Sequence, residues 1–386
     1  MPLRLRLHGG LFALAALTAS SLACQSAGFS PSTPPPTEAR VPNPEGLATD
    51  VVDQPTPEVV STEPAANPTQ ATVQQGGAGS DYTQPIAIGE TLSVASWDVA
   101  VVKYAYGDQA IETLKTMTDM LDPLPDGYQY VVVQLRATGR FNDTENHAVP
   151  YSLTLLAENR HGYFSRGFPT VKEPFEGEVR SGESVEGWLV FQTPTDTSRF
   201  QLVFSDYDRD FNLDEGYFAL SADAALPPAD TAAFPAENKV GIDPKNPAQV
   251  GDTVVTGGFA VTITEIRRGD AAAEIIDSAN SFAPSAPEGQ EYALARVRVE
   301  ALGVEAKLQH FTTILFSVQP STGDPIGLPF MVLPGESADA PLAPGAVLEA
   351  WLPLALPVDD PGAVLYYDPT FSFGDESPAR YFAVAP

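Results

Sequence analysis

The chain has 386 residues, and its 21 lysine and arginine residues face 50 aspartate and glutamate residues, which gives a formal net charge of −29. A polyanion of this kind is repelled by nucleic acid, so nucleic acid is excluded as a partner. With 43% hydrophobic residues and one cysteine, the chain can bury sizeable cores but cannot close an internal disulfide bond.

Residues 1–23 have the three parts of a secretory signal peptide. Arg4 and Arg6 give a positive start, residues 11–17 form a short apolar core, and small residues lead to Ala23. The apolar stretch is too short to cross a bilayer core of about 30 Å. We therefore expect this segment to direct export.

The single cysteine, Cys24, directly follows Ser21-Leu22-Ala23, and this arrangement resembles the lipobox of bacterial lipoproteins. The resemblance implies cleavage before Cys24 and lipidation of its sulfur, with the protein anchored through lipid to the outer face of a membrane. The alternative is an ordinary secretory signal with an incidental cysteine. A lone exported thiol without a use would be a reactive liability, which favours lipidation.

Four further segments follow the predicted signal peptide. Residues 24–83 are rich in proline, serine and threonine and predict a disordered tether. Residues 84–222 and 246–386 are rich in valine, leucine, phenylalanine and tyrosine, and a proline- and alanine-rich stretch, 223–245, separates them. Each apolar segment is long enough to hold its own core, so we expect two domains joined by a linker.

The second apolar segment repeats the first. Gly89-Glu90-Thr91 aligns with Gly251-Asp252-Thr253 at an offset of 162 residues, and Trp188 aligns with Trp351 at an offset of 163. A period this long indicates a duplicated domain rather than a solenoid of short repeats.

Most of each repeat alternates between apolar and polar residues, which is typical of half-buried strands. Arg136 and Arg298 fall in the outward-facing set. The predicted strands are 130–137, 152–157, 187–191, 200–204, 253–255, 259–266, 292–299 and 311–318. Many short strands separated by turns predict an all-β fold of two tandem immunoglobulin-like β-sandwiches.

One stretch of each repeat has helical rather than strand spacing. Ile111, Leu114, Met117 and Leu121 are three or four residues apart, which predicts a short amphipathic helix over 108–120. We expect it to pack over one end of the sandwich. The alternative is a lid or a partner-binding face.

The pattern resembles the DUF4352 family of immunoglobulin-like sandwiches found in bacterial surface lipoproteins and related to secreted mycobacterial immunoprotective antigens. The residues that carry the resemblance are 88–91, 127–133, 181–184, 187–191 and Pro194 in the first repeat, and 250–253, 289–292, 344–345 and Pro357 in the second. The resemblance implies a sandwich fold and no particular activity, because a fold does not determine a function.

The sequence offers no constellation for catalysis. A nucleophile needs an adjacent base, but Cys24 is assigned to lipidation and the histidines His147, His161 and His310 stand alone in the sequence. Spacings typical of zinc or nucleotide sites are also missing. We therefore expect a non-enzymatic protein without a bound cofactor.

One acidic stretch is a weak candidate for Ca²⁺ binding. Asp206, Asp208, Asp210 and Asp214 are spaced like oxygen ligands. The EF-hand glycine position holds Phe211 instead, and a solvated acidic loop is the favoured interpretation.

Three functional hypotheses remain. The first is a non-enzymatic cell-surface lipoprotein that binds a protein or a cell-envelope polymer. The second is an accessory lipoprotein of a transport or envelope system that binds a small ligand or Ca²⁺. The third is a hydrolase that uses two carboxylates brought together by the fold.

Overall fold

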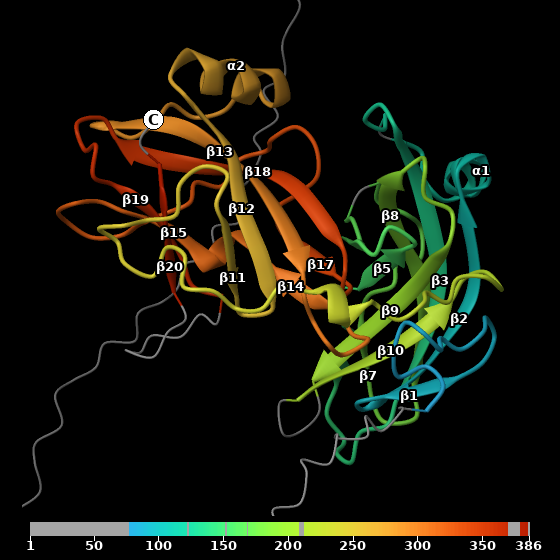
Figure 1. The fold of residues 1–386 in the computed structure, drawn as a ribbon. Coiled ribbons are helices and arrows are strands. Elements are labelled where there is room, and N and C mark those ends of the chain that lie inside the picture. The colour runs from blue at the N-terminus through green and yellow to red at the C-terminus, as the bar shows by residue number, and fades with distance from the viewer. Residues whose placement is uncertain are drawn as a thin grey trace, which may run out of the picture. The chain divides into compact units, whose positions relative to one another are not determined.

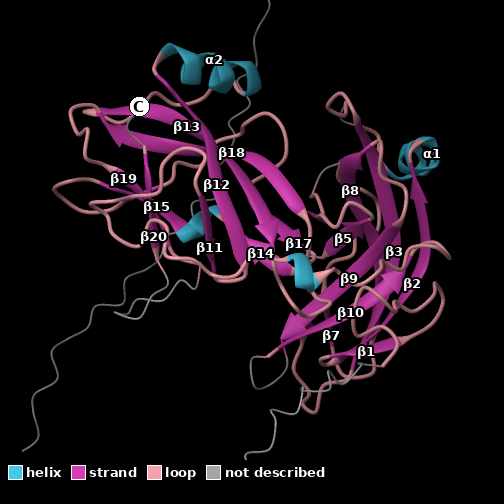
Figure 2. Ribbon diagram, viewed as in Figure 1, coloured by secondary structure: helices cyan, strands magenta, loops and turns pink. Residues whose placement is uncertain are grey.

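The computed structural model describes residues 77–121, 123–150, 153–167, 169–207, 212–369 and 379–384. Strands dominate these residues, which confirms the predicted all-β fold (Figure 2). The predicted signal peptide, Cys24 and most of the predicted tether lie outside the described residues. No helix within the described ranges is long and apolar enough to cross a membrane.

Residues 92–219 form two four-stranded antiparallel sheets and a two-stranded ribbon (Figure 1). The first sheet has the order β1 (Leu92–Val94), β2 (Trp97–Tyr106), β3 (Tyr128–Gly139) and β8 (Ser184–Pro194). The second has the order β10 (Leu213–Ala219), β9 (Phe200–Tyr207), β5 (Thr154–Ala157) and β6 (Gly162–Phe164). The ribbon pairs β4 (His147–Ala148) with β7 (Glu178–Val179). We call this unit the first sandwich.

Residues 253–383 repeat this topology, and we call them the second sandwich. Its first sheet has the order β11 (Thr253–Thr256), β12 (Phe259–Arg268), β13 (Gln290–Ala301) and β18 (Val347–Pro357). Its second has the order β20 (Arg380–Ala383), β19 (Val364–Tyr367), β15 (Phe316–Gln319) and β16 (Ile326–Gly327). The ribbon pairs β14 (Gln309–Phe311) with β17 (Ala340–Leu342).

The duplication extends to irregular features. The register of β2 against β3 shifts between Val101 and Lys103, and the register of β12 against β13 shifts between Ile263 and Glu265. These two bulges are 162 residues apart, as the sequence alignment requires. A bulge is an inserted residue that bends one strand, so its recurrence is independent support for two copies of one fold.

The alternation of the long strands explains why they form a sandwich. In β3, Val131, Val133 and Leu135 are fully buried in the core between the sheets, whereas Arg136 is exposed and pairs with Glu186 on β8. Each buried aliphatic side chain contributes about 1.5–3 kcal/mol relative to an exposed one. The predicted outward position of Arg136 is therefore confirmed.

The predicted helix is present in both repeats as α1 (Asp108–Met117) and α2 (Asp270–Ala279). Gly107 precedes α1 with a φ of 58°, a left-handed conformation that glycine adopts at no steric cost. The buried side chains Ala110, Leu114 and Met117 pack on the outer face of the first sheet. The helix therefore covers apolar surface that the sheet alone would expose.

The extent of one predicted strand is corrected, and packed residues occur in parts of the predicted tether and linker. The predicted strand over 311–318 is interrupted by a 3₁₀ turn, Thr313–Leu315, because Asp339 accepts hydrogen bonds from the Thr313 amide at 2.7 Å and from the Thr312 hydroxyl at 2.6 Å. Packing also begins before residue 84, since Tyr82 is only 1% exposed. In the segment predicted as a linker, Ala224 and Leu226 are buried and a second 3₁₀ turn spans Thr231–Ala233.

Candidate functional site

The weak Ca²⁺ candidate lies on the β9–β10 hairpin. Asp206 and Asp214 are opposite each other in the strand register, but both carboxylates already accept hydrogen bonds. Asp206 accepts from the Trp97 indole N–H at 2.7 Å, and Asp214 accepts from the Ala95 amide at 2.7 Å. These bonds attach the hairpin to the β1–β2 turn, so both side chains have a structural role.

The other two candidate ligands, Asp208 and Asp210, lie outside the described residues. Within the described ranges, no group of three or more histidine, cysteine, aspartate or glutamate side chains could hold a metal ion. The Ca²⁺ site therefore stays a prediction.

A more defined site lies where the first sandwich contacts the second, beside the turn that precedes β6. Arg160 in this turn donates to the Pro227 carbonyl at 2.7 Å and to the Pro344 carbonyl at 3.1 Å. Its guanidinium also lies over the ring of Tyr82, 5.6 Å from the ring centroid. A single guanidinium therefore connects three separate segments.

Gly162 allows the chain to approach β17 closely at this contact. A Cβ atom at this position would lie 2.9 Å from the Pro341 carbonyl oxygen and 2.7 Å from the Thr154 methyl carbon. Real Cβ contacts are not this short, so only glycine fits without displacement of β17.

His161 is buried in the same contact and has partners on both ring nitrogens. Its Nε2 lies 2.9 Å from the Val347 carbonyl oxygen, and its Nδ1 lies 3.2 Å from Glu336 Oε2. A neutral imidazole has one N–H and donates from only one ring nitrogen. Both contacts are therefore hydrogen bonds only when a second proton is bound, either to the His161 ring or to the Glu336 carboxylate. His161 stands alone in the sequence but has a partner in the fold.

The other two histidines have different surroundings. His147 stacks on Phe141 with ring centroids 3.7 Å apart, and its Nε2 lies 2.8 Å from Asp143 Oδ1. The His310 ring lies 6.2 Å from the ring of Phe164.

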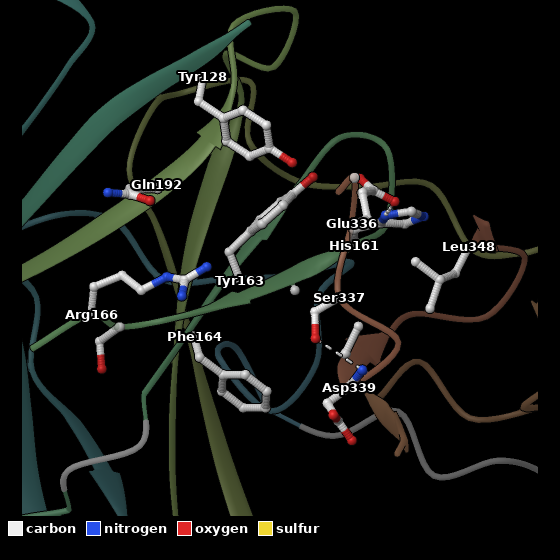
Figure 3. Close-up of a pocket in the computed structure, with 14 residues that line it drawn as sticks. Tyr128, His161, Tyr163, Phe164, Arg166, Gln192, Glu336, Ser337, Asp339 and Leu348 are labelled. Atoms are coloured by element: carbon white, nitrogen blue, oxygen red, sulfur yellow. Dashed lines mark hydrogen bonds and ion pairs between the residues drawn. The ribbon is translucent and has the colours of Figure 1, made fainter. Parts of the chain in front are cut away.

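The contact borders a cleft of about 260 Å³ (Figure 3). Its walls come from β3, β6, β8 and the loop over 335–340, and they combine aromatic with polar side chains. The side chains that line it include Tyr128, His161, Tyr163, Phe164, Arg166, Gln192, Glu336, Ser337 and Asp339. The volume is just below the usual range for sites that take drug-sized ligands, so the cleft suits a smaller ligand or one unit of a polymer.

The charged groups of the cleft lie apart. Arg166 and Gln192 are at one end, Glu336 and His161 are at the other, and the two tyrosine rings lie between them (Figure 3). Burial raises the pKa of the Tyr128 hydroxyl, Glu336 raises it further, and Arg166 lowers it. Burial also raises the pKa of Tyr163, whose hydroxyl accepts a hydrogen bond from Asn159 at 2.9 Å.

The sequence did not indicate this cleft. Its walls come from parts of the chain that are far apart. A usable signal lies in the repeat alignment. Where the first sandwich has Tyr128, Arg166 and Gln192, the strand registers place Gln290, Pro329 and Ala355 in the second.

Three solved structures are similar to part of this chain. No family model matches the sequence, and no curated protein matches it. An uncharacterized β-sandwich protein from Clostridium difficile 630 has a TM-score of 0.24 and 10% identity, over 36% of this chain and 96% of its own. The candidate lipoprotein ycdA from Bacillus subtilis strain 168 has a TM-score of 0.25 and 15% identity, over 35% of this chain and 40% of its own. The yjhA protein from Bacillus subtilis has a TM-score of 0.24 and 14% identity, over 35% of this chain and 99% of its own. The resemblance to the DUF4352 family therefore stays a prediction.

Proposed function

We propose that this chain is a non-enzymatic, lipid-anchored binding module on the outer face of a membrane, and that the cleft beside β6 is its binding site for a protein or a cell-envelope polymer. The observation that carries the proposal is a cleft whose wall is fixed by contacts within the protein. Arg160 and Gly162 hold the wall of the cleft in place, so the site is formed before a ligand arrives.

The acidic groups of the cleft support binding over catalysis. Glu336 contacts His161, and Asp339 accepts hydrogen bonds from Thr312 and Thr313. A general base must be able to reach a proton of the substrate. Here both carboxylates hold structural bonds instead.

The anchoring part of the proposal is tested in cells. We expect processing that is sensitive to globomycin, a mature N-terminus at Cys24, and release from the membrane fraction in Cys24→Ser. A mature N-terminus at any other residue would refute anchoring and leave the binding proposal in place.

The binding part is tested by crosslinking on whole cells. A photoreactive residue at Gln192 should capture a partner, and the same residue at Glu112, which is exposed on α1, is the control outside the cleft. Ser337→Trp, which fills the cleft, should abolish the capture from Gln192. Equal capture from both positions, or capture that survives Ser337→Trp, would contradict the proposal.

A second candidate function is docking of a protein on the face that carries α2. Phe282 and Phe330 are 92% and 99% exposed, and they adjoin an apolar cluster that contains Ile276 and Met331. Asp270, Glu274 and Asp277 on α2 are exposed, so the face suits a partner with apolar and basic groups. The test is capture of a partner by crosslinking on whole cells. Its loss in the double variant Phe282→Ser/Phe330→Ser would support this candidate if Met120→Ser, at the position of the first sandwich that corresponds to Phe282, keeps the capture.

The accessory role with Ca²⁺ has one supporting observation, which is that Asp206 and Asp214 are opposite each other across two strands. Titration with Ca²⁺ is expected to give binding heat and to raise the melting temperature if the site exists. The absence of both effects would exclude it.

A further inference from the structure

Arg166 is notable because of the charge of the chain. Acidic residues outnumber lysine and arginine by 50 to 21. Several other arginines pair with a carboxylate, as Arg136 does with Glu186, Arg268 with Glu291 and Arg296 with Glu349. Within the described ranges, the Arg166 guanidinium has neither an ion pair nor a hydrogen-bond acceptor, although it faces a cleft.

Two further donor groups of the cleft are in the same situation. Among the described residues, the Tyr128 hydroxyl and the Gln192 side-chain amide make no hydrogen bond. Tyr128 and Gln192 are on adjacent strands, since Tyr130 is the register partner of Gln192. Arg166 lies beside β8, the strand that contains Gln192, because the Arg166 amide donates a hydrogen bond to the Val190 carbonyl at 2.7 Å. The backbone therefore places these three residues along the cleft. Arg166 and Gln192 lie at one end, and the Tyr128 hydroxyl points toward the Tyr163 hydroxyl (Figure 3).

We propose that the cleft binds its ligand through a carboxylate group, which Arg166 receives at the end of the cleft that it shares with Gln192; this inference rests on the proposed function. The planar guanidinium matches the two oxygens of a carboxylate, and such charge-assisted pairs are stronger than neutral hydrogen bonds. Tyr163 and Phe164 provide apolar surface for the remainder of the ligand. The chain as a whole is negative and repels anions. Binding of a carboxylate would therefore depend on direct contact with the Arg166 guanidinium.

The second sandwich is an internal comparison. At the positions that correspond to Tyr128, Arg166 and Gln192 in the strand registers it has Gln290, Pro329 and Ala355. Sandwich stability does not need this set of donors, because the same topology forms without it. The set is therefore better explained by a ligand than by folding.

A carboxylate could come from an acidic saccharide or from the C-terminus of a peptide, and calorimetric titration of the full chain distinguishes them. The first pair of probes is digalacturonic acid and its methyl ester. The second pair is N-acetyl-alanyl-alanine and its C-terminal amide. We expect one of the two acids to bind, and its neutral counterpart to bind about 10- to 100-fold more weakly, as expected for loss of a hydrogen bond to a charged group.

Variants assign the effect to Arg166. Arg166→Gln should weaken binding of the acid about 10- to 100-fold and abolish the preference over the neutral probe. Arg166→Lys should restore part of the affinity, because it keeps the charge without the planar fork. Arg199→Gln, a second arginine of the first sandwich without an ion pair among the described residues, is the matched control and should bind normally. Melting temperatures of all variants show whether folding is intact.

Equal binding of acid and neutral probe, or unchanged binding in Arg166→Gln, would overturn the inference. So would the failure of both acids to bind at millimolar concentration. The proposed function has a separate readout, since crosslinking from Gln192 that is lost in Ser337→Trp would still support the cleft as a binding site.

Discussion

The two sandwiches share one topology but fill their interiors with different side chains. In the first, β3 contributes Val131 and Val133 to the core, and in the second the corresponding residues of β13 are Ala293 and Ala295. The two cores also place their aromatic residues at different positions, and in the second Phe311 packs against Phe316 with ring centroids 5.7 Å apart. Because protein interiors are close-packed, we expect other side chains of the second core to fill the volume that its smaller β13 residues leave.

The sandwiches also differ in which polar groups they expose. The first carries the donors of the cleft, and the second contributes Glu336 and the loop that closes the far wall. The two copies of one topology therefore carry different polar groups at the cleft, because surface side chains can change without loss of core packing. The comparison predicts that core substitutions act on stability and that cleft substitutions act on binding.

The largest effect is expected from the residue at the start of β2 or β12. Trp97 is 1% exposed and donates to Asp206, and its counterpart Phe259 is 4% exposed and packs edge-on against Phe311. Trp97→Ala and Phe259→Ala should each reduce the unfolding free energy by about 3–5 kcal/mol. Trp97→Phe should cost about 1–2 kcal/mol, because it keeps most of the ring but removes the hydrogen bond to Asp206.

Urea unfolding followed by circular dichroism measures these changes. Phe282→Ser, at an exposed position, is the control and should stay within about 0.5 kcal/mol of the parent chain. A small effect at Trp97 together with a large one at Phe259 would show that the two β2-type strands are not equivalent.

Substitution of Arg160 tests the contact that fixes the cleft. Arg160→Ala removes two hydrogen bonds to carbonyl groups and the contact with Tyr82, and should cost about 1.5–3 kcal/mol. Limited proteolysis near residue 227 should become faster, because this segment loses its attachment. Arg160→Lys should be intermediate, since lysine cannot reach both carbonyl groups with one planar fork. Unchanged proteolysis in Arg160→Ala would show that other contacts suffice.

Exchange of core residues between the sandwiches tests the compensation of volume. Ala295→Val should destabilise the second sandwich by about 1–3 kcal/mol through overpacking. Val133→Ala should destabilise the first by about 2 kcal/mol through lost burial and a cavity. Combined with Phe316→Leu, Ala295→Val should become less costly than it is alone. A stabilising Ala295→Val would mean that the second core contains a void rather than a compensated volume.

The sequence was sufficient for the features that repeat locally. The constant offset predicted two copies, alternation predicted the long strands β3 and β13, and helical spacing predicted α1. Alternation and helical spacing depend on neighbours within about ten residues, where residue type and period carry the information, and the offset is read by direct comparison of the two copies. The interruption at Thr313 was missed because the residue that causes it, Asp339, is distant in the sequence.

The cleft could not be predicted for the same reason. Arg166 comes close to Gln192 only because it forms a bridge to Val190, which is on the same strand, β8, as Gln192. Glu336 contacts His161 from the other repeat. Single-residue patterns contain no information about such contacts. The strongest residue-level candidates, Asp206 and Asp214, instead hold the β1–β2 turn in place.

The smallest expected effect concerns a buried carboxyl group that distinguishes the sandwiches. Glu215 in the first sandwich is 5% exposed, and its counterpart in the second, two residues before Tyr381, is Ala379. Burial raises the pKa of Glu215, whereas the hydrogen bond from the Tyr217 hydroxyl, at 2.8 Å, lowers it. The net shift is upward, so the folded protein holds this proton at pH values where the unfolded chain has released it.

This shift gives stability a pH dependence opposite in sign to that of a salt-bridged acid. Between the unfolded pKa of about 4.3 and the raised folded pKa, the folded state binds more protons, so the unfolding free energy falls as pH rises, by up to about 1.4 kcal/mol per pH unit. Glu215→Gln should remove this slope, and Tyr217→Phe should extend it to higher pH, because the hydroxyl that lowers the pKa is gone. Urea unfolding at a series of pH values from 4 to 8 measures the difference between each variant and the parent chain. A difference that does not change with pH would show that Glu215 is not protonated more readily in the folded state, and the buried carboxyl group would then be a tolerated charge rather than a feature that separates the two copies.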